Sequence, residues 1–161
     1  MTSTSIIVER HIGADPTSTA LLLAGPTAVD LWPGVRRVGE VGGRVLVEAC
    51  IDPPALRAVP DRPRPQTDAA LTAASVTAHP PRRTPTAFVS RFGWVGPGLP
   101  ATEGVLTLTY APGEQTPSTR AQLVLDAAAI EHSRLDGSTL AWMAERFLAN
   151  LALAAESRCA A

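Results

Sequence analysis

The stretch ADPTSTALLLAGPTAVDLWPGV, residues 14–35, decides how the rest of the chain is interpreted. Asp15 is a good N-cap, and Pro16 stands at the first helical position, where a missing N–H costs no hydrogen bond. Gly25-Pro26 ends this helix, and Thr27 is expected to cap a second short helix that ends at the Trp-Pro-Gly step. The stretch therefore predicts two short helices separated by a single break.

The segments on either side of these helices predict β-strands. Residues 5–12 form a strand before them, and residues 35–41 and 44–51 form two strands after them. The last two are joined by Gly42-Gly43, because adjacent glycines permit positive φ at both central positions of a tight hairpin turn. In the second strand of this hairpin, the residues expected to face the core are Val45, Val47, Ala49 and Ile51.

The second half of the chain predicts more strands and then a helix. Residues 69–79 form a weak strand of small side chains, and the strands at 86–95, 104–111 and 119–126 have connections short enough for an antiparallel meander. From Asp136, a plausible N-cap, a helix should run to about Ser157. Its apolar stripe consists of Leu140, Ala144, Phe147, Leu151 and Ala155.

Composition narrows the class of protein. The 161 residues suit one domain, 1–161, in which the Pro- and Arg-rich segment 53–68 is interpreted as a flexible loop or a flap over a site. All 14 basic residues are Arg and the net charge is −1, which argues against a P-loop lysine and against a nucleic-acid partner. The Arg, Ala and Pro bias is typical of a bacterial genome rich in G and C. Because no signal peptide or membrane span is evident, we expect a cytoplasmic protein.

The sequence contains no motif that is typical of a metal-binding or cofactor-binding site. Cys50 and Cys159 form no CxxC pair, and the three histidines are dispersed. GxSxG, HExxH, GxGxxG and Walker motifs are absent. We therefore predict no metal, no cofactor and no nucleotide.

The order of the predicted elements resembles the SRPBCC superfamily, which includes START lipid-transfer domains, bacterial polyketide cyclases and Bet v 1-like allergens. Two segments carry the resemblance: residues 14–35, and residues 104–108 followed by a turn and a Thr-led final strand. The resemblance covers nearly the whole chain. It implies an α+β helix-grip fold, with a curved seven-stranded antiparallel sheet wrapped around a long C-terminal helix and two short helices after the first strand.

Candidate site residues are isolated polar and apolar side chains that an apolar cavity would bring together. Three of them are candidates for chemistry: Tyr110 as a hydrogen-bond donor to a ligand, Arg91 as a stabiliser of an enolate, and His79 as a general base. Each also has a plain interpretation as a core tyrosine, an outward-facing arginine and an exposed loop histidine. The predicted ligand-binding residues are Phe88, Phe92, Trp94, Leu106, Leu108, Met143, Phe147 and Asn150.

Three functions follow, from different classes. The first is a binding protein, a monomer or homodimer, that holds a small hydrophobic or aromatic molecule, such as a polyketide or lipid, between the sheet and the last helix. The second is a polyketide cyclase or dehydratase of natural-product biosynthesis, which would fold a reactive chain by proximity. The third is a protein-interaction module that uses the exposed sheet.

Overall fold

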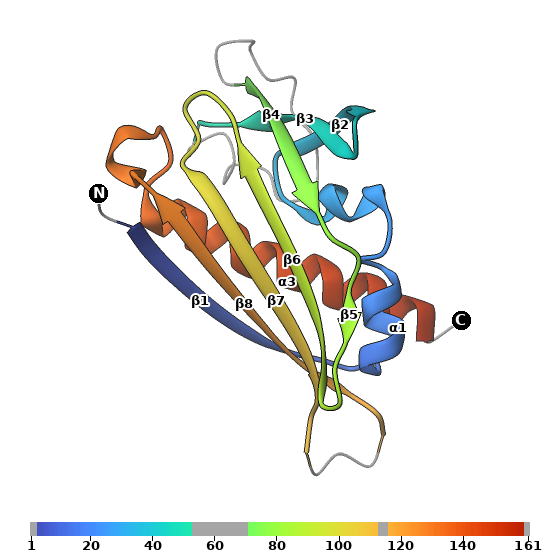
Figure 1. Ribbon diagram of the computed structural model, residues 1–161. Coiled ribbons are helices and arrows are strands. Elements are labelled where there is room, and N and C mark those ends of the chain that lie inside the picture. Colours follow the sequence, from blue (N-terminus) through green and yellow to red (C-terminus); the bar gives the residue numbers. More distant parts are fainter. Residues whose placement is uncertain (1–2, 53–70, 113–115, 160–161) are drawn as a thin grey trace.

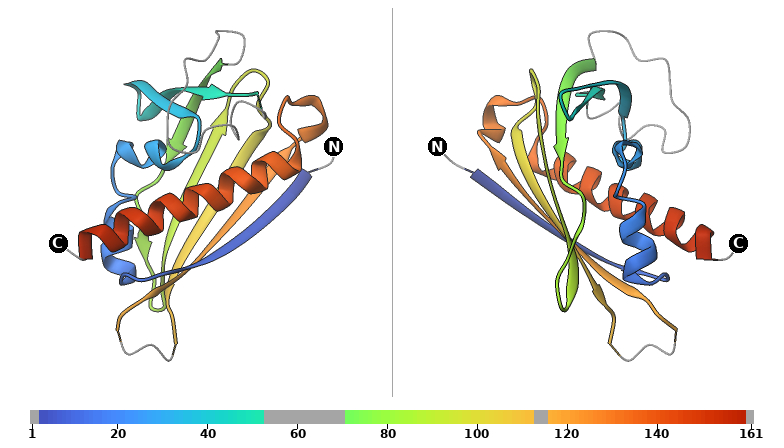
Figure 2. Two further views of the ribbon diagram at one scale, coloured as in Figure 1. Left: turned by 180° about the vertical axis from the view of Figure 1, so that it is seen from behind. Right: turned by 45° about the vertical axis from the view of Figure 1, so that its right-hand side comes forward.

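The computed structural model describes residues 3–52, 71–112 and 116–159, and it consists of one curved antiparallel sheet against one long helix. Figure 1 shows the strands in front of the helix α3, and Figure 2 shows the same helix from behind, lying along the sheet. The strands are β1 (Ser3–Ile12), β2 (Val35–Val41), β3 (Arg44–Cys50), β4 (Leu71–Ala78), β5 (Arg82–Arg83), β6 (Ala87–Val95), β7 (Ala101–Tyr110) and β8 (Thr119–Ala128). The helices are α1 (Pro16–Leu21), η1 (Pro26–Leu31), η3 (Ile130–His132) and α3 (Gly137–Cys159).

The sheet follows the order β1-β8-β7-β6-β4-β3-β2, and β5 adds a short pairing to β6. The predicted meander is confirmed, because β6, β7 and β8 are sequential neighbours. The first strand pairs with the last one over their whole length, from Ser3 opposite Ala128 to Ile12 opposite Thr119. The sheet therefore brings its first and last strands in sequence side by side, and β2 and β1 form its edges.

The local signals at the first helix act as the sequence predicts. The Asp15 carboxylate accepts a hydrogen bond from the Ser18 N–H at 2.6 Å, and Pro16 opens the helix. The second helix differs from the prediction: it is a 3₁₀ helix that begins at Pro26, after Gly25, and no side chain caps it. Thr27 is therefore inside this helix, because the proline fixes a helical φ one residue earlier.

The long C-terminal helix buries the apolar stripe that the sequence predicts. The Asp136 carboxylate caps it by accepting the Thr139 N–H at 2.7 Å. The five stripe residues are each at most 3% exposed; four of them pack in one cluster with the inner-facing leucines of β7 and β8, and Leu140 packs in a neighbouring cluster with Ala127. This burial of apolar surface between helix and sheet is the main stabilising contribution to the fold.

Other parts of the prediction need correction or lie outside the described residues. The prolines after β4 do not only break the sheet, because Arg82 and Arg83 pair with β6 as an eighth strand.

The predicted hairpin turn is confirmed, because Gly42 and Gly43 both have positive φ, 58° and 77°, as this turn requires. The predicted loop at 53–68 lies outside the described residues. Within the described ranges, no helix combines the length and the apolar character needed to cross a membrane.

Candidate functional site

Alternation along the strands gives the sheet two chemically different faces. On β6, Phe88, Ser90, Phe92 and Trp94 point to the inner face, toward α3, and the residues between them point to the outer face. On this strand the predicted ligand-binding residues, Phe88, Phe92 and Trp94, therefore face the inner side, and the predicted catalytic residue Arg91 faces the outer side.

An aromatic cluster occupies the inner side, between the sheet and the helix. Trp32, which follows η1, stacks on Phe147 of α3 with ring centroids 4.4 Å apart and an interplanar angle of 21°. The same indole contacts Trp94 edge-on at 5.0 Å and Phe92 at 5.8 Å. Phe147 is 3% exposed, whereas the other three rings are only partly buried. The cluster thus has a buried end on the helix and an accessible end on the sheet.

A glycine on the neighbouring strand makes room for one ring of this cluster. Phe92 lies directly opposite Gly104 in the β6–β7 ladder. A Cβ added to Gly104 would come within 2.7 Å of Phe92 Cε1 and closer still to Cζ. The Phe92 ring therefore lies flat over the backbone of β7, in space that any larger residue would take.

The other predicted ligand-binding residues lie on the inner side at different depths. Leu106 and Leu108 are 1% exposed and belong to the main core, while Phe88 is partly buried beside it. Met143 is buried in a neighbouring cluster, against which Trp32 and Trp94 also pack. Asn150 has a structural contact: its Nδ2 donates to the Leu31 carbonyl oxygen at 2.8 Å and ties α3 to the end of η1.

The three residues proposed for chemistry do not meet the aromatic cluster. Tyr110 has the parity of Leu106 and Leu108, but it lies at the end of β7 and is 63% exposed. Arg91 and His79 are both exposed, on the outer face and beside it. They are adjacent, since the His79 N–H donates to the Arg91 carbonyl oxygen at 2.9 Å. The structure brings these two together and leaves Tyr110 apart from both.

Three inner-side residues were not selected from the sequence. Trp32, in the Trp-Pro-Gly step that ends the second helix, is the ring that joins the helix and sheet parts of the cluster. Ser90 is 7% exposed between Phe88 and Phe92, and its hydroxyl has no hydrogen-bond partner among the described residues. Arg83 pairs with Phe88 across the ladder, which places its exposed side chain on the same side of the sheet. The alternation of β6 would have identified Ser90; the other two depend on tertiary structure.

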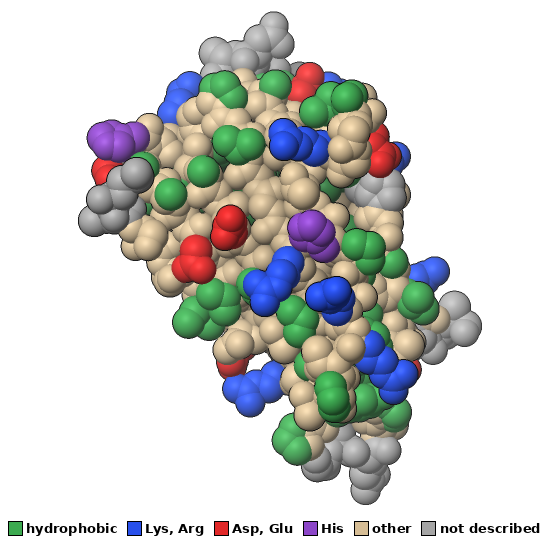
Figure 3. Space-filling view, in the orientation of Figure 1, with side chains coloured by type: hydrophobic (Ala, Val, Ile, Leu, Met, Phe, Trp, Pro, Cys, Tyr) green, Lys and Arg blue, Asp and Glu red, His purple; other side chains and the backbone are tan. Residues whose placement is uncertain are grey.

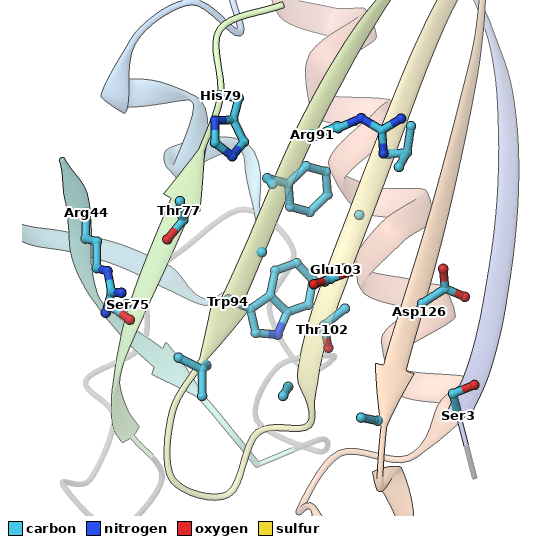
Figure 4. Close-up of a pocket in the computed structure, with 17 residues that line it drawn as sticks. Ser3, Arg44, Ser75, Thr77, His79, Arg91, Trp94, Thr102, Glu103 and Asp126 are labelled. Atoms are coloured by element: carbon cyan, nitrogen blue, oxygen red, sulfur yellow. The ribbon is translucent and has the colours of Figure 1, made fainter. Parts of the chain in front are cut away.

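The outer face carries a hollow of about 680 Å³. Figure 4 shows His79 and Arg91 on one part of its border and Glu103 and Asp126 on another, with Arg44 and Ser75 further along. Figure 3 shows acidic, basic and histidine side chains around an area of polar and backbone atoms on this face. The hollow is thus bordered by both signs of charge.

Cys50 is a buried free thiol, 1% exposed. Burial raises the pKa of this thiol, an effect that its contact with the Asp52 carbonyl oxygen at 3.7 Å only partly offsets. Because the thiolate is the nucleophile and the metal ligand, burial makes Cys50 a poor candidate for either role. Within residues 3–52, 71–112 and 116–159, no group of three or more His, Cys, Asp or Glu side chains could hold a metal ion.

Comparisons with known proteins agree on the fold. No protein-family model matches the sequence, and no curated protein sequence matches it. Among solved structures, a conserved protein from Geobacillus kaustophilus has a TM-score of 0.61 at 9% identity, over 96% of each chain. Ara h 8.0201 has a TM-score of 0.59 at 9% identity, over 97% of this chain and 99% of that one. The ZhuI aromatase/cyclase from Streptomyces sp. R1128 has a TM-score of 0.52 at 15% identity, over 98% of this chain and 96% of that one.

These likenesses, together with the strand order and the long last helix, define the architecture. The chain has a helix-grip fold, with a curved antiparallel sheet around a long C-terminal helix and two short helices after the first strand. At these identities the likeness concerns the fold, and function has to be argued from the site.

Proposed function

We propose that this protein binds a small hydrophobic or aromatic molecule on the inner side of the sheet, against Phe92, Trp94 and Trp32. The observation that carries the proposal is the aromatic cluster itself, whose three accessible rings lie between sheet and helix. Aromatic surfaces of this kind gain free energy when a ligand covers them, and ring pairs add about 0.5–1.5 kcal/mol beyond the buried area.

The Ser90 hydroxyl adds a polar contact to this apolar wall. Ser90 is 7% exposed, so a ligand oxygen that accepts a hydrogen bond from its hydroxyl adds a directed contact to the apolar ones. We therefore expect a ligand with an apolar ring system and one oxygen, such as a phenol or a ketone, to bind more tightly than the corresponding hydrocarbon.

Binding is favoured over cyclisation because of where the acid–base candidates lie. A cyclase or dehydratase needs a proton donor or acceptor within hydrogen-bond reach of the reacting chain. The Arg91 and His79 side chains lie on the outer side of the sheet, in a hollow whose lining also includes Phe92 and Trp94, and Tyr110 lies at the exposed end of β7. The aromatic cluster therefore has hydrophobic contact and one hydroxyl to offer, which suits binding.

The test is a fluorescence titration with Nile red, an uncharged aromatic dye, followed by displacement with 2-naphthol. We expect the dye emission to rise and shift to the blue, and Trp94→Ala to weaken dye binding by about tenfold, or 1.4 kcal/mol. The matched control is Val95→Ala, one residue further along β6, whose side chain is 55% exposed on the outer face. Ser90→Ala should weaken 2-naphthol more than naphthalene.

Three results would contradict the proposal. The first is the absence of a saturable dye signal, and the second is an equal effect of Trp94→Ala and Val95→Ala on dye binding. The third is a 2-naphthol displacement that is the same in Trp94→Ala, in Ser90→Ala and in the wild type. Native mass spectrometry of the freshly purified protein provides a second measurement, because a co-purified small molecule adds a discrete mass that Trp94→Ala should reduce in abundance.

A further inference from the structure

Two ion pairs on the outer face join a charged side chain to a partner on the next strand. Arg36 of β2 pairs with Glu48 of β3, directly opposite in the ladder. Arg120 of β8 donates to both carboxylate oxygens of Glu9 on β1, at 3.0 and 3.2 Å. Opposite charges in such cross-strand positions contribute roughly 0.2–1 kcal/mol each, so this is the arrangement that stabilises a sheet.

The charges around the outer hollow are arranged in the opposite way. Glu103 of β7 lies directly opposite Asp126 of β8, so two carboxylates are neighbours. Like charges in directly opposite positions destabilise a sheet. Among the described residues Glu103 has no ion-pair partner, and Asp126 accepts only from the Ser5 hydroxyl. The sheet gains no stability from this pair.

Basic groups gather on the other part of the border. Arg91 of β6 is next to His79, which directly follows β4, and Arg44 of β3 borders the hollow further along. Within the described ranges none of the three side chains forms an ion pair. Figure 4 shows the Arg91 side chain extending from β6 over β7, while Glu103 lies further along β7, nearer to Trp94.

The space between the two groups is open because small residues form its floor. Gly93 lies opposite Glu103 on β6, and Thr77 lies opposite Gly93 on β4. Neighbouring strands are about 4.8 Å apart, so the basic and acidic groups, one to four strands apart, are separated across the sheet by roughly 5–19 Å. A hollow of about 680 Å³ has the size of a small-molecule site.

From this segregation we propose that the outer hollow is a second binding site, for a small dipolar molecule with a phosphate or carboxylate at one end and an ammonium group at the other. The anionic end binds Arg91 and His79, because a guanidinium offers paired donors to such groups. The ammonium end binds Glu103 and Asp126, whose mutual repulsion it relieves. The lining of this hollow also includes Phe92 and Trp94 of β6, so the second site adjoins the aromatic cluster along this strand.

The test compares O-phosphoethanolamine, which has both charges, with ethyl phosphate and ethylamine, which have one each. Amide chemical shifts of Gly93 and Thr77 are followed in ¹⁵N–¹H spectra at constant ionic strength, because salt screens exposed charges. We expect saturable shifts with O-phosphoethanolamine and an affinity about tenfold higher than for either single-charge probe. Arg91→Gln and Glu103→Gln should each remove this advantage.

The control is Arg36→Gln, on the same face but in an ion pair away from the hollow, which should leave the affinity unchanged. Equal shifts with all three probes, or an advantage that survives both hollow variants, would overturn the proposal. So would concentration-dependent shifts without any probe that Arg91→Gln abolishes, because a second copy of the chain would then occupy this face. All three substituted residues are exposed, and melting temperatures close to that of the wild type show that each variant folds.

Discussion

Gly104→Ala gives the sharpest test of the packing around the aromatic cluster. In a β-strand without positive φ, alanine is ordinarily the better residue, because glycine loses more backbone entropy on folding, by roughly 0.5–1 kcal/mol. Here the added methyl group meets the Phe92 ring, within 2.7 Å of Cε1, where ordinary contacts begin at 3.4 Å. The ring has to move by about 1 Å.

The neighbours of Phe92 determine what this movement costs. The ring lies 5.8 Å from Trp94 and 5.8 Å from Trp32, and Trp32 is itself stacked on Phe147. Overpacking of this kind costs typically 1–3 kcal/mol. After the entropic gain is subtracted, we expect Gly104→Ala to lower the free energy of unfolding by about 1–2 kcal/mol. For a chain of this length that corresponds to a melting temperature lower by roughly 3–6 °C.

Urea denaturation followed by far-UV circular dichroism measures this loss, and near-UV circular dichroism reports on the tryptophans of the cluster. The control is Gly39→Ala in β2, where a Cβ would have no heavy atom within 4 Å. That variant should be as stable as the wild type or slightly more stable. The reasoning would be refuted if Gly104→Ala were as stable as Gly39→Ala and its near-UV spectrum were unchanged.

Three further predictions concern the helix and the buried thiol. Phe147→Asp places an unpaired charge in the core and should lower the free energy of unfolding, measured by urea denaturation, by roughly 3 kcal/mol or more. The control Leu153→Asp, at a position 67% exposed on the same helix, should cost less than about 1 kcal/mol, and similar losses in the two variants would show that the Phe147 face is not buried. Asn150→Leu leaves the Leu31 carbonyl oxygen without its donor and should cost about 1–3 kcal/mol by the same measurement, a loss that a variant of unchanged stability would contradict. Because burial raises the pKa of Cys50, the native state favours the protonated thiol, so the stability that this group contributes is complete below the pKa of the unfolded thiol and declines as pH rises through the pKa of the folded one. In a Cys159→Ser background at pH 8, iodoacetamide should react with native Cys50 far more slowly than with the urea-unfolded chain, and equal rates would refute its burial.

The parts of the fold that the sequence predicts are those with local causes. Asp15 and Asp136 cap helices through hydrogen bonds to residues three positions later. The glycine pair after β2 has the two positive φ values that its turn requires. The apolar stripe of α3 follows from helical periodicity alone. Each of these features depends on side chains a few residues apart, so no knowledge of distant contacts is needed.

The candidate site was harder to predict, because alternation along a strand indicates which face of the sheet a side chain is on but not how deeply it is buried. Tyr110 has the same parity as Leu106 and Leu108, yet it lies at the strand end and is mostly exposed. Trp32 meets Phe147, and Asn150 meets Leu31, across more than a hundred residues of sequence. Neither contact leaves a periodic signal, because Trp32 lies in a connection and not in a strand or an α-helix.

The outer hollow needed the register of the sheet as well. Glu103 and Asp126 become neighbours only because β7 and β8 pair with that particular alignment. A shift of one residue would place Leu125 or Ala127 opposite Glu103, depending on its direction, and would move a whole set of side chains to the other face. Charge segregation is therefore a tertiary property, and the sequence indicated only that Arg91 has an outward-facing alternative.

The strand β6 provides a way to test the two proposed sites separately, because its successive side chains point to opposite faces. Trp94→Ala removes an inner ring, and Arg91→Gln, three residues away, removes an outer charge. Because Trp94 also lines the outer hollow, we expect the first variant to weaken Nile red binding more than O-phosphoethanolamine binding, and the second variant to do the reverse. In the double variant the two free-energy losses should add within about 0.5 kcal/mol, as they do for independent sites. A larger interaction energy would show that β6 couples the two faces, and loss of both ligands in either single variant would refute the assignment of separate sites.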